Sequence, residues 1–475
     1  MESISSSGST VVTANYGRLR RRLVTGVVLL VVLLVGGGIA LGILVGGDSD
    51  AGGDAVAVPD AQLPQLGDAE PVLAALGSEA PVPDPGVLAA ALTPIATGPA
   101  LGPGTTAQVV DVATGEVLYD LDAAAPLTPA STAKLLTAAA ALTALDPSDT
   151  IETRVVSGAA PGEVVLVGGG DPTLSRTEPS LTYPGAPTMT DLATQVVAAL
   201  PAGTPVTRVV VDSSLYSGPL TASGWGAGDA PSSYAAPVTA TAVDGARVSS
   251  GSTARSGQPG IDAGAALADA LGAPGAAVVL GQAPAGATTL GTVQSAPISR
   301  LVEQALSMSD NVLAETLARQ VALARNEPAT FEGAARAVVD ALDEIGLDVT
   351  GVTLADGSGL SSQNVVTAEV LASLITGAAE GSLGDAAGLL AGLPVAGYDG
   401  TLADRGDEDP ATAPGTVRGK TGTLLGVNAL AGTVVTADGR LLAFSVVADE
   451  TTASEAAAEA ALDQFAATLA ACGCS

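Results

Sequence analysis

The chain has 475 residues, of which 47% are hydrophobic, and a formal net charge of −31 at pH 7. A chain of this length can form two or three domains, each with its own hydrophobic core. A chain this acidic, with no basic stripe, repels the phosphates of nucleic acids, which excludes nucleic-acid binding. The absence of histidine and the presence of only two cysteines argue against a zinc or iron site. We therefore expect an enzyme that works without a metal or any other cofactor.

The first predicted element is a membrane-spanning helix over residues 23–47, which are uncharged and rich in Val, Leu, Ile and Gly. As a helix this segment is about 37 Å long, enough to cross a hydrocarbon layer of about 30 Å. The arginines that precede it predict a cytoplasmic N-terminus (residues 1–22) and a folded part outside the membrane. A cleaved signal peptide is the alternative, but its apolar region is usually shorter. We favour an uncleaved anchor.

A flexible linker is predicted over residues 48–90, which are rich in Asp, Gly, Ala and Pro. The folded part is expected to begin near Ala91. Residues 106–110 and 117–120 then flank a short polar turn and predict a β-hairpin.

The next predicted element is a helix over residues 131–144, which are apolar, rich in alanine and free of Gly and Pro.

Residues 155–285 differ in composition from the segments on either side. They contain short Val-rich strands (163–167 and 208–211) between many Gly and Pro turns, and little helical pattern. We interpret them as an inserted β-rich domain.

The rest of the chain predicts helices and then strands. The expected helices are 298–325, 332–345 and 367–379. Strands at 430–436 and 441–447 flank Asp438-Gly439, a strong signal for a hairpin, and a closing helix covers 452–471.

Strands near both ends with helices between them predict an α+β fold, in which an antiparallel sheet flanked by helices is interrupted by the inserted domain. The predicted organisation is a cytoplasmic N-terminus (1–22), a transmembrane anchor (23–47), a linker (48–90), the first part of the main domain (91–154), the inserted domain (155–285) and the second part of the main domain (286–475).

Three short motifs contain the residues with catalytic chemistry. The chain has only two lysines. Lys134 ends a Ser-x-x-Lys that begins at Ser131, and Lys420 begins Lys420-Thr421-Gly422, with Ser309-Asp310-Asn311 between them. A genome poor in lysine codons would explain why lysines are few, but not why both fall in such motifs. Because there is no histidine, a serine nucleophile in this chain needs a lysine as its base.

The spacing of these residues suits that chemistry. Residues i and i+3 share one face of a helix, so Lys134 can reach the Ser131 hydroxyl. The pKa of a lysine, normally about 10.4, must fall by roughly three units to give a useful base. Burial and repulsion from Lys420 are the expected causes. Ser309 would bridge the lysines and pass the proton on to the leaving amine, and Asn311 would orient the substrate amide.

Each motif alone has an ordinary interpretation. The Ser-x-x-Lys could lie on a helix surface, the Ser-Asp-Asn could cap a helix, and the Lys-Thr-Gly could end an edge strand. All three in this order, in a chain without another lysine, favour catalysis, because the same three motifs define a group of serine acyl-transfer enzymes.

With these motifs the chain resembles the penicillin-recognising serine acyl-enzymes, and in particular the class C low-molecular-mass penicillin-binding proteins. The resemblance spans roughly residues 95–470. Further motifs that carry it are Pro129-Ala130-Ser131, Gly168-Gly169-Gly170-Asp171-Pro172-Thr173-Leu174, Tyr234-Ala235-Ala236-Pro237-Val238, Asp356-Gly357-Ser358-Gly359-Leu360-Ser361, Leu393-Pro394-Val395-Ala396-Gly397 and Gly400-Thr401-Leu402.

The resemblance implies a β-lactamase/transpeptidase-like fold and a D-alanyl-D-alanine carboxypeptidase/endopeptidase that acts on peptidoglycan and is also acylated by β-lactams. It implies that Ser131 forms the acyl-enzyme with Lys134 as its base, and that Ser309 and Asn311 form the second motif. Lys420 with Thr421, Gly422 and Thr423 would hold the terminal carboxylate. Backbone N–H groups of Ser131 and Thr423 would form the oxyanion hole.

Three alternatives stay open. A serine β-lactamase of class A needs a deacylating glutamate between the first two motifs, but Glu152, Glu163 and Glu178 lie in strand- or turn-like sequence. A non-catalytic receptor that senses β-lactams or peptidoglycan would not need both lysines. A membrane-tethered adhesin would leave the three motifs unexplained.

Overall fold

The computed structural model describes residues 80–405 and 414–473. The predicted membrane helix (23–47), the segment before it and most of the linker lie outside these residues. Within the described part of the chain, no helix is both long and apolar enough to cross a membrane.

Helix α2 (Pro85–Ala96) shows that the folded part begins before Ala91, so the predicted linker is too long at its C-terminal end. Asp84 caps the helix by accepting hydrogen bonds from the N–H groups of Gly86 and Val87. Pro85 is typical of a linker in a sequence, yet a proline is also favourable at the first position of a helix, where its missing N–H is not needed. Leu88 and Leu92 are fully buried.

The main sheet combines both ends of the folded part, as predicted, with the strand order β10-β11-β12-β1-β2 and all neighbours antiparallel. Its strands are β1 (Thr105–Asp111), β2 (Val117–Leu121), β10 (Val417–Leu424), β11 (Val427–Val435) and β12 (Leu441–Ala448). Both predicted hairpins are confirmed. Strand β1 pairs with β2 on one side and with β12, the central strand, on the other.

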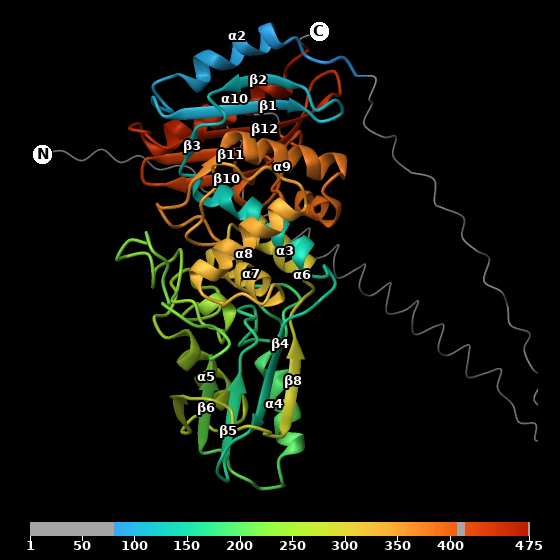
Figure 1. Cartoon of the computed structure of the whole chain (residues 1–475). Helices are drawn as coiled ribbons and strands as arrows, with labels where there is room; N and C mark the ends of the chain where they lie inside the picture. The colour runs from blue at the N-terminus through green and yellow to red at the C-terminus, as the bar shows by residue number, and fades with distance from the viewer. Residues whose placement is uncertain (1–79, 406–413, 474–475) are drawn as a thin grey trace, which may run out of the picture. The chain divides into compact units, whose positions relative to one another are not determined.

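Helices cover both faces of this sheet (Figure 1). Leu430, Phe444 and Val446 belong to the core on the face covered by α2 and α10 (Glu455–Ala470). Ala429 and Val447, which alternate with them along β11 and β12, belong to the core shared with the other helices. Those helices are α3 (Lys134–Ala144), α6 (Ile298–Ser307), α7 (Asn311–Ala324), α8 (Phe331–Glu344) and α9 (Ala368–Glu380).

Short elements complete the main domain. They are the two-stranded sheet of β3 (Pro126–Leu127) and β9 (Val366–Thr367), and the 3-10 helices η1 (Ala130–Ala133), η3 (Gly384–Gly392) and η4 (Gly400–Leu402).

The single helix predicted over 298–325 is wrong. The chain leaves the helical path between α6 and α7, and Ser309 adopts a left-handed conformation with φ of 51°. The apolar period is continuous across the break, and no Gly or Pro marks it. The local signal for the break is Asp310, which caps α7 through its side chain, in agreement with the helix-cap interpretation of the second motif. The left-handed conformation of Ser309 has no such local signal.

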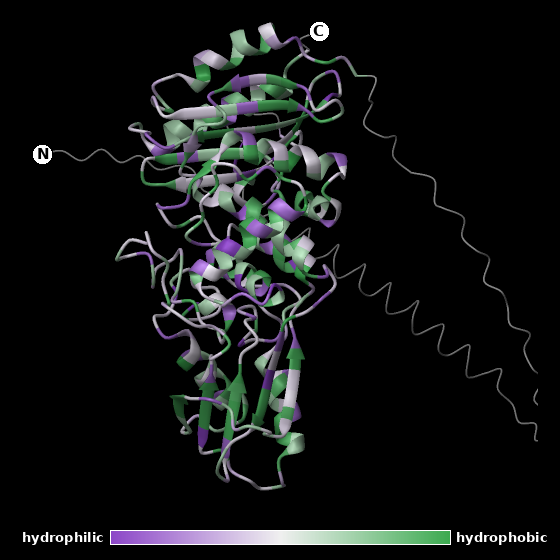
Figure 2. Ribbon diagram, viewed as in Figure 1, coloured by the Kyte–Doolittle hydropathy of each residue, from purple (hydrophilic) through white to green (hydrophobic). Residues whose placement is uncertain are grey.

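The inserted domain contains its own mixed five-stranded sheet of order β7-β6-β5-β4-β8. Its strands are β4 (Glu152–Ser157), β5 (Glu163–Val167), β6 (Arg208–Asp212), β7 (Ala277–Leu280) and β8 (Thr289–Gln294). The sheet thus begins before residue 155 and ends after residue 285, and it holds apolar residues along its strands (Figure 2). The helix η2 (Asp244–Ala246) belongs to the same region.

The expectation of little helix in the insert is also wrong, because α4 (Met189–Ala199) and α5 (Pro259–Ala270) pack on this sheet. Helix α5 is built from small residues and begins with proline and glycine. Its sequence therefore lacks the long apolar stripe by which a helix is usually recognised.

A pair of glycines brings β10 close to β11 at the position where β10 holds Lys420. Gly419 is paired with Gly432 across the two strands. A Cβ atom at position 432 would collide with the carbonyl oxygen of Arg418. The absence of a side chain at Gly432 therefore permits the observed register beside the lysine, whereas a Cβ at Gly419 would be tight but would lie 3.1 Å from the end of the Leu430 side chain.

We expect Gly432→Ala to lower the free energy of unfolding by about 2–3 kcal/mol, because overpacking a buried strand against backbone atoms forces the strands apart. Urea unfolding of residues 80–475 measures this. Gly275→Ala is the matched control, since its added methyl group meets open space. Equal stability of the two variants would contradict the role given to the glycine pair.

Candidate active site

The ammonium group of Lys134 joins three segments that are far apart in the sequence. Its Nζ lies 2.9 Å from the Oγ of Ser131, 2.5 Å from the Oδ1 of Asn311 and 2.6 Å from the carbonyl oxygen of Ser358. The lysine is 1% exposed. The structure thus brings the first two predicted motifs into direct contact, with a third partner from the Asp356–Ser361 loop.

Close backbone packing positions Ser131. The chain enters η1 through Ala130 with φ of 47°, a conformation rare for residues other than glycine. A Cβ at Gly359 would collide with the Ala130 carbonyl, and one at Gly422 would lie 2.7 Å from the Pro129 carbonyl oxygen. These two glycines therefore allow the Ser358 loop and strand β10 to approach the serine from two sides.

The pKa of Lys134 is lowered to about 8, chiefly because burial disfavours the charged amine. The nearby carboxylates of Asp356, Glu315 and Asp310 oppose this shift, whereas the Arg255 cation adds to it. A lysine with this pKa has a substantial neutral fraction near pH 8. It can therefore accept a proton from the hydroxyl group that it contacts.

Lys420 is fully buried on β10, and its Nζ donates to the carbonyl oxygen of Thr421 at 2.8 Å. Burial and then repulsion from Lys134 lower its pKa well below the ordinary value. The expected repulsion between the lysines thus lowers the pKa of Lys420. The cation that lowers the pKa of Lys134 is Arg255. A bound anion would offset both effects on Lys420.

The two polar residues of the second motif differ in their contacts. Asn311 begins α7, accepts from Lys134 through Oδ1 and donates through Nδ2 to the carbonyl oxygen of Tyr234 at 3.2 Å. Ser309 is half-buried beside the cleft, and among the described residues its hydroxyl forms no hydrogen bond with either lysine. The structure therefore does not contain the predicted bridge between the lysines.

Sequence reasoning missed Glu315, which supports the third partner of Lys134. Glu315 is fully buried one turn after Asn311, and its Oε1 accepts from the N–H groups of Gly357 (3.1 Å) and Ser358 (2.8 Å). Burial raises its pKa to about 7. The sequence does contain a sign of this residue, because a carboxyl group in the middle of an apolar helix is unusual.

Asp356 holds the same loop from its other side. Its carboxylate accepts from the N–H groups of Gly359 (2.8 Å) and Ser361 (2.7 Å), and from the indole N–H of Trp225 at 2.7 Å. The loop that presents the Ser358 carbonyl is therefore fixed by two buried carboxyl groups.

A cleft of about 810 Å³ opens over Ser131. Ser309, Asn311, Thr421 and Thr423 all line it, while Lys134 and Lys420 lie beneath its surface. Other lining residues come from the inserted domain (Asp229, Tyr234, Arg247, Arg255) and from η4 (Thr401).

The edge position of β10 explains how Thr423 faces this cleft. The Val417 carbonyl and the Gly419 N–H bond outward to Ala396 and Pro394 instead of to β11. Alternation along an antiparallel strand then points the N–H groups of Thr421 and Thr423 outward as well. The predicted oxyanion donor at Thr423 is thus on the cleft side of the sheet.

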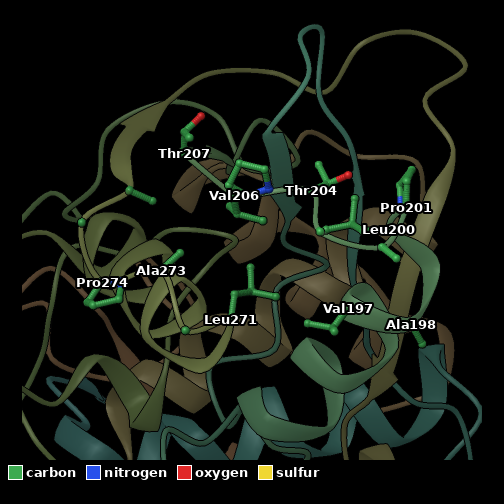
Figure 3. Close-up of a pocket in the computed structure, with 16 residues that line it drawn as sticks. Val197, Ala198, Leu200, Pro201, Thr204, Val206, Thr207, Leu271, Ala273 and Pro274 are labelled. Carbon is green, nitrogen blue, oxygen red and sulfur yellow. The ribbon is translucent and has the colours of Figure 1, made fainter.

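A second cavity, of about 840 Å³, lies in the inserted domain between residues 197–207 and 271–276 (Figure 3). Its lining consists of Val, Ala, Leu, Pro, Gly and Thr, without a charged side chain. It offers no activated nucleophile, so the cleft over Ser131 is the candidate active site.

Comparisons with known proteins place the chain in one family. Residues 88–259 and 248–469 match the family described as D-Ala-D-Ala carboxypeptidase 3 (S13). Carboxypeptidase DacB of Mycolicibacterium smegmatis is 40% identical over 443 residues, 92% of this chain and 94% of that protein. The D-alanyl-D-alanine carboxypeptidase of Actinomadura sp. strain R39 is 32% identical, over 71% of this chain and 76% of that protein.

Among solved structures, penicillin binding protein 4 from Haemophilus influenzae has a similar fold, with a TM-score of 0.64 at 23% identity. The match covers 81% of this chain and 98% of that one.

We expect Glu315→Gln to move the pH dependence of Ser131 reactivity to lower pH by about one unit, because it removes an anion that raises the pKa of Lys134. In the unchanged protein the rate should rise as pH passes through about 8, where Lys134 loses its proton. The rate at which a fluorophosphonate modifies Ser131, followed from pH 6 to pH 10 in the unchanged protein and in the variant, measures the midpoint of this rise and its shift. The cations Arg255 and Lys420 and the acids Asp310 and Asp356 also surround Lys134 and are unchanged in this variant. A shift to higher pH would contradict the assignment.

Proposed function

The chain belongs to the D-Ala-D-Ala carboxypeptidase 3 (S13) family, and from this we propose that it is a serine-type D-alanyl-D-alanine carboxypeptidase, a hydrolase that acts on the stem peptides of peptidoglycan. The observation that carries the proposal is the contact of 2.9 Å between the buried Nζ of Lys134, whose pKa is lowered, and the hydroxyl of Ser131.

In the proposed first step, the Oγ of Ser131 attacks the carbonyl carbon of the penultimate D-alanine while neutral Lys134 takes the hydroxyl proton. The negative charge that develops on the carbonyl oxygen is stabilised by the N–H groups of Ser131 and Thr423. The peptide bond then breaks, and Lys134 gives up the proton that it took, which passes to the nitrogen of the departing D-alanine. We propose Ser309, which lines the cleft, as the relay for this proton once substrate is bound.

In the second step, water attacks the acyl-enzyme ester and gives a proton to Lys134 as the new bond forms. The ester bond breaks, the proton returns to the Ser131 oxygen, and the shortened peptide leaves as a carboxylic acid. The lysine thus acts as a base in both half-reactions and returns the proton each time.

Recognition of the leaving residue is assigned to Lys420 with Thr421, Gly422 and Thr423. A carboxylate beside Lys420 would compensate the buried charge whose pKa is otherwise strongly lowered. This favours substrates with a free terminal carboxylate, hence carboxypeptidase activity, and endopeptidase activity on cross-linked peptides is the second activity that we propose for this site.

We also propose β-lactams as partners that acylate Ser131. The support is the similar fold of the Haemophilus influenzae penicillin binding protein 4, whose structure in complex with a β-lactam matches this chain with a TM-score of 0.60. A β-lactamase is less well supported, because Glu152 and Glu163 lie on β4 and β5 and neither lines the cleft.

For its location, we propose that the enzyme is held in the cell membrane by one helix over residues 23–47, with the catalytic part on the cell-wall side. The support is the length of that uncharged segment and the arginines before it. Peptidoglycan lies on the same side.

We expect Ser131→Ala to abolish covalent modification by benzylpenicillin, and Lys134→Ala to slow it by about 10²- to 10⁴-fold, the usual contribution of a general base. Intact-mass spectrometry of residues 80–475 over time measures the adduct. An adduct of normal rate on the Ser131→Ala variant would refute the nucleophile, and rapid conversion of the drug without a persistent adduct would favour a β-lactamase.

We expect Lys420→Ala to raise KM for a peptide ending in D-Ala-D-Ala by roughly tenfold to a hundredfold, the value of one charge-assisted hydrogen bond. Release of D-alanine is the assay. The same peptide with an amidated C-terminus is the control, because without a carboxylate the two proteins should differ little. An equal loss on the amidated peptide would show that Lys420 does not recognise the carboxylate.

A further inference from the structure

The inserted domain reaches the second motif through the carboxylate of Asp310, which is 4% exposed. Its Oδ1 accepts from Nη2 of Arg255 at 3.1 Å, and its Oδ2 accepts from the hydroxyl of Tyr183 at 2.7 Å. Nη2 of Arg247 lies 3.4 Å from the same Oδ2. Tyr183, Arg247 and Arg255 all belong to the inserted domain, and we call them the Asp310 clamp.

The same carboxylate also fixes the start of α7. Asp310 is the N-cap of that helix and accepts from the N–H groups of Val312 (3.0 Å) and Leu313 (3.3 Å). The two arginines hold the pKa of Asp310 low despite its burial. The carboxylate is therefore charged and surrounded by donors, so a shift of the clamp would also move the N-terminus of α7.

The residues on either side of Asp310 depend on this position. Asn311 follows it and contacts Lys134, while its Nδ2 donates to Tyr234, which is also in the inserted domain. Ser309 precedes it with φ of 51°. A non-glycine residue keeps such a conformation only where its surroundings fix it.

Gly245 makes room for the clamp. It has φ of 65°, and a Cβ there would collide with the hydroxyl of Tyr183 and lie 2.6 Å from Nη1 of Arg247. The arginines are also tied to the insert: Nη1 of Arg247 donates to the Asp244 carbonyl at 3.0 Å, and Nη1 of Arg255 to the Gly245 carbonyl.

We propose that the Asp310 clamp positions the second motif against Lys134, which makes the inserted domain part of the machinery for acyl transfer. The clamp residues are positioning residues, since they hold Asp310. Arg255 also lowers the pKa of Lys134, so rates of its variants are compared on the plateau at high pH, where Lys134 is neutral in every variant. The measurement of kcat rests on the proposed function, because it needs a D-Ala-D-Ala peptide to be a substrate. The rate at which a fluorophosphonate modifies Ser131 tests the inference without that substrate.

The first test is Tyr183→Phe, which removes one hydrogen bond to Asp310 at a residue that does not line the cleft. We expect kcat for D-alanine release to fall about threefold to tenfold with KM unchanged, and the fluorophosphonate rate to fall in proportion. Removing Arg255 also raises the pKa of Lys134, so both rates are compared on the plateau at high pH. There Arg255→Gln should lower both by about tenfold to a hundredfold, the effect of a displaced catalytic group, and Arg255→Lys should restore part of the loss.

Two variants control for lost stability. Tyr216→Phe removes the hydroxyl of another buried tyrosine of the insert, which contacts Gln320. Arg440→Gln breaks a buried ion pair with Asp111 outside the cleft. Both should lower Tm while leaving kcat and the fluorophosphonate rate of the folded protein unchanged.

Equal kinetics of Tyr183→Phe and Tyr216→Phe would overturn the proposal. So would a raised KM with unchanged kcat in Arg255→Gln, because the arginine would then bind substrate directly. A clamp effect on the fluorophosphonate rate would uphold the inference even if D-Ala-D-Ala peptides proved not to be substrates.

Discussion

The buried ammonium of Lys134 is the interaction on which the rest of the site depends. An amine in the protein interior is strongly destabilising unless its donors are matched, and here the three acceptors come from Ser131, Asn311 and Ser358. Helix α3, the break before α7 and the loop after α8 must therefore meet at one point. The close approaches at Gly359 and Gly422 follow from that requirement, since any side chain there would push the segments apart.

Charge is arranged in layers around this lysine. The atoms that touch it are neutral acceptors, while the carboxyl groups of Glu315, Asp356 and Asp310 lie one layer further out. Direct contact with a carboxylate would keep the lysine protonated, and complete isolation would keep it neutral. The intermediate arrangement gives a pKa near 8, which suits a group that must both accept and return a proton.

The features that local chemistry determines could be predicted from the sequence. The hairpin at Asp438-Gly439, the helix after Ser131 and the meeting of Ser131 with Lys134 all depend on residues close in sequence. The left-handed turn at Ser309 and the partners of Glu315 could not be predicted, because contacts from distant segments impose them. The sequence marked Glu315 only as a carboxyl group within an apolar helix. The partners of Asp310 were missed for the same reason: an arginine 55 residues away in the chain gives no periodic signal.

The pairing of β1 with β12 also has a consequence for how the protein is made. Thr105 is paired with Ala448, so β1 completes its pairing only after a segment 343 residues further along the chain has been synthesised. Every residue of β1 is buried in the finished sheet, and until β12 arrives one edge of it has no neighbour. Folding that closes so long a loop is slow. Because β10 joins the sheet through β11, Ser131 gains the strand on one side of its cleft only after β11 and β12 have been added to the sheet.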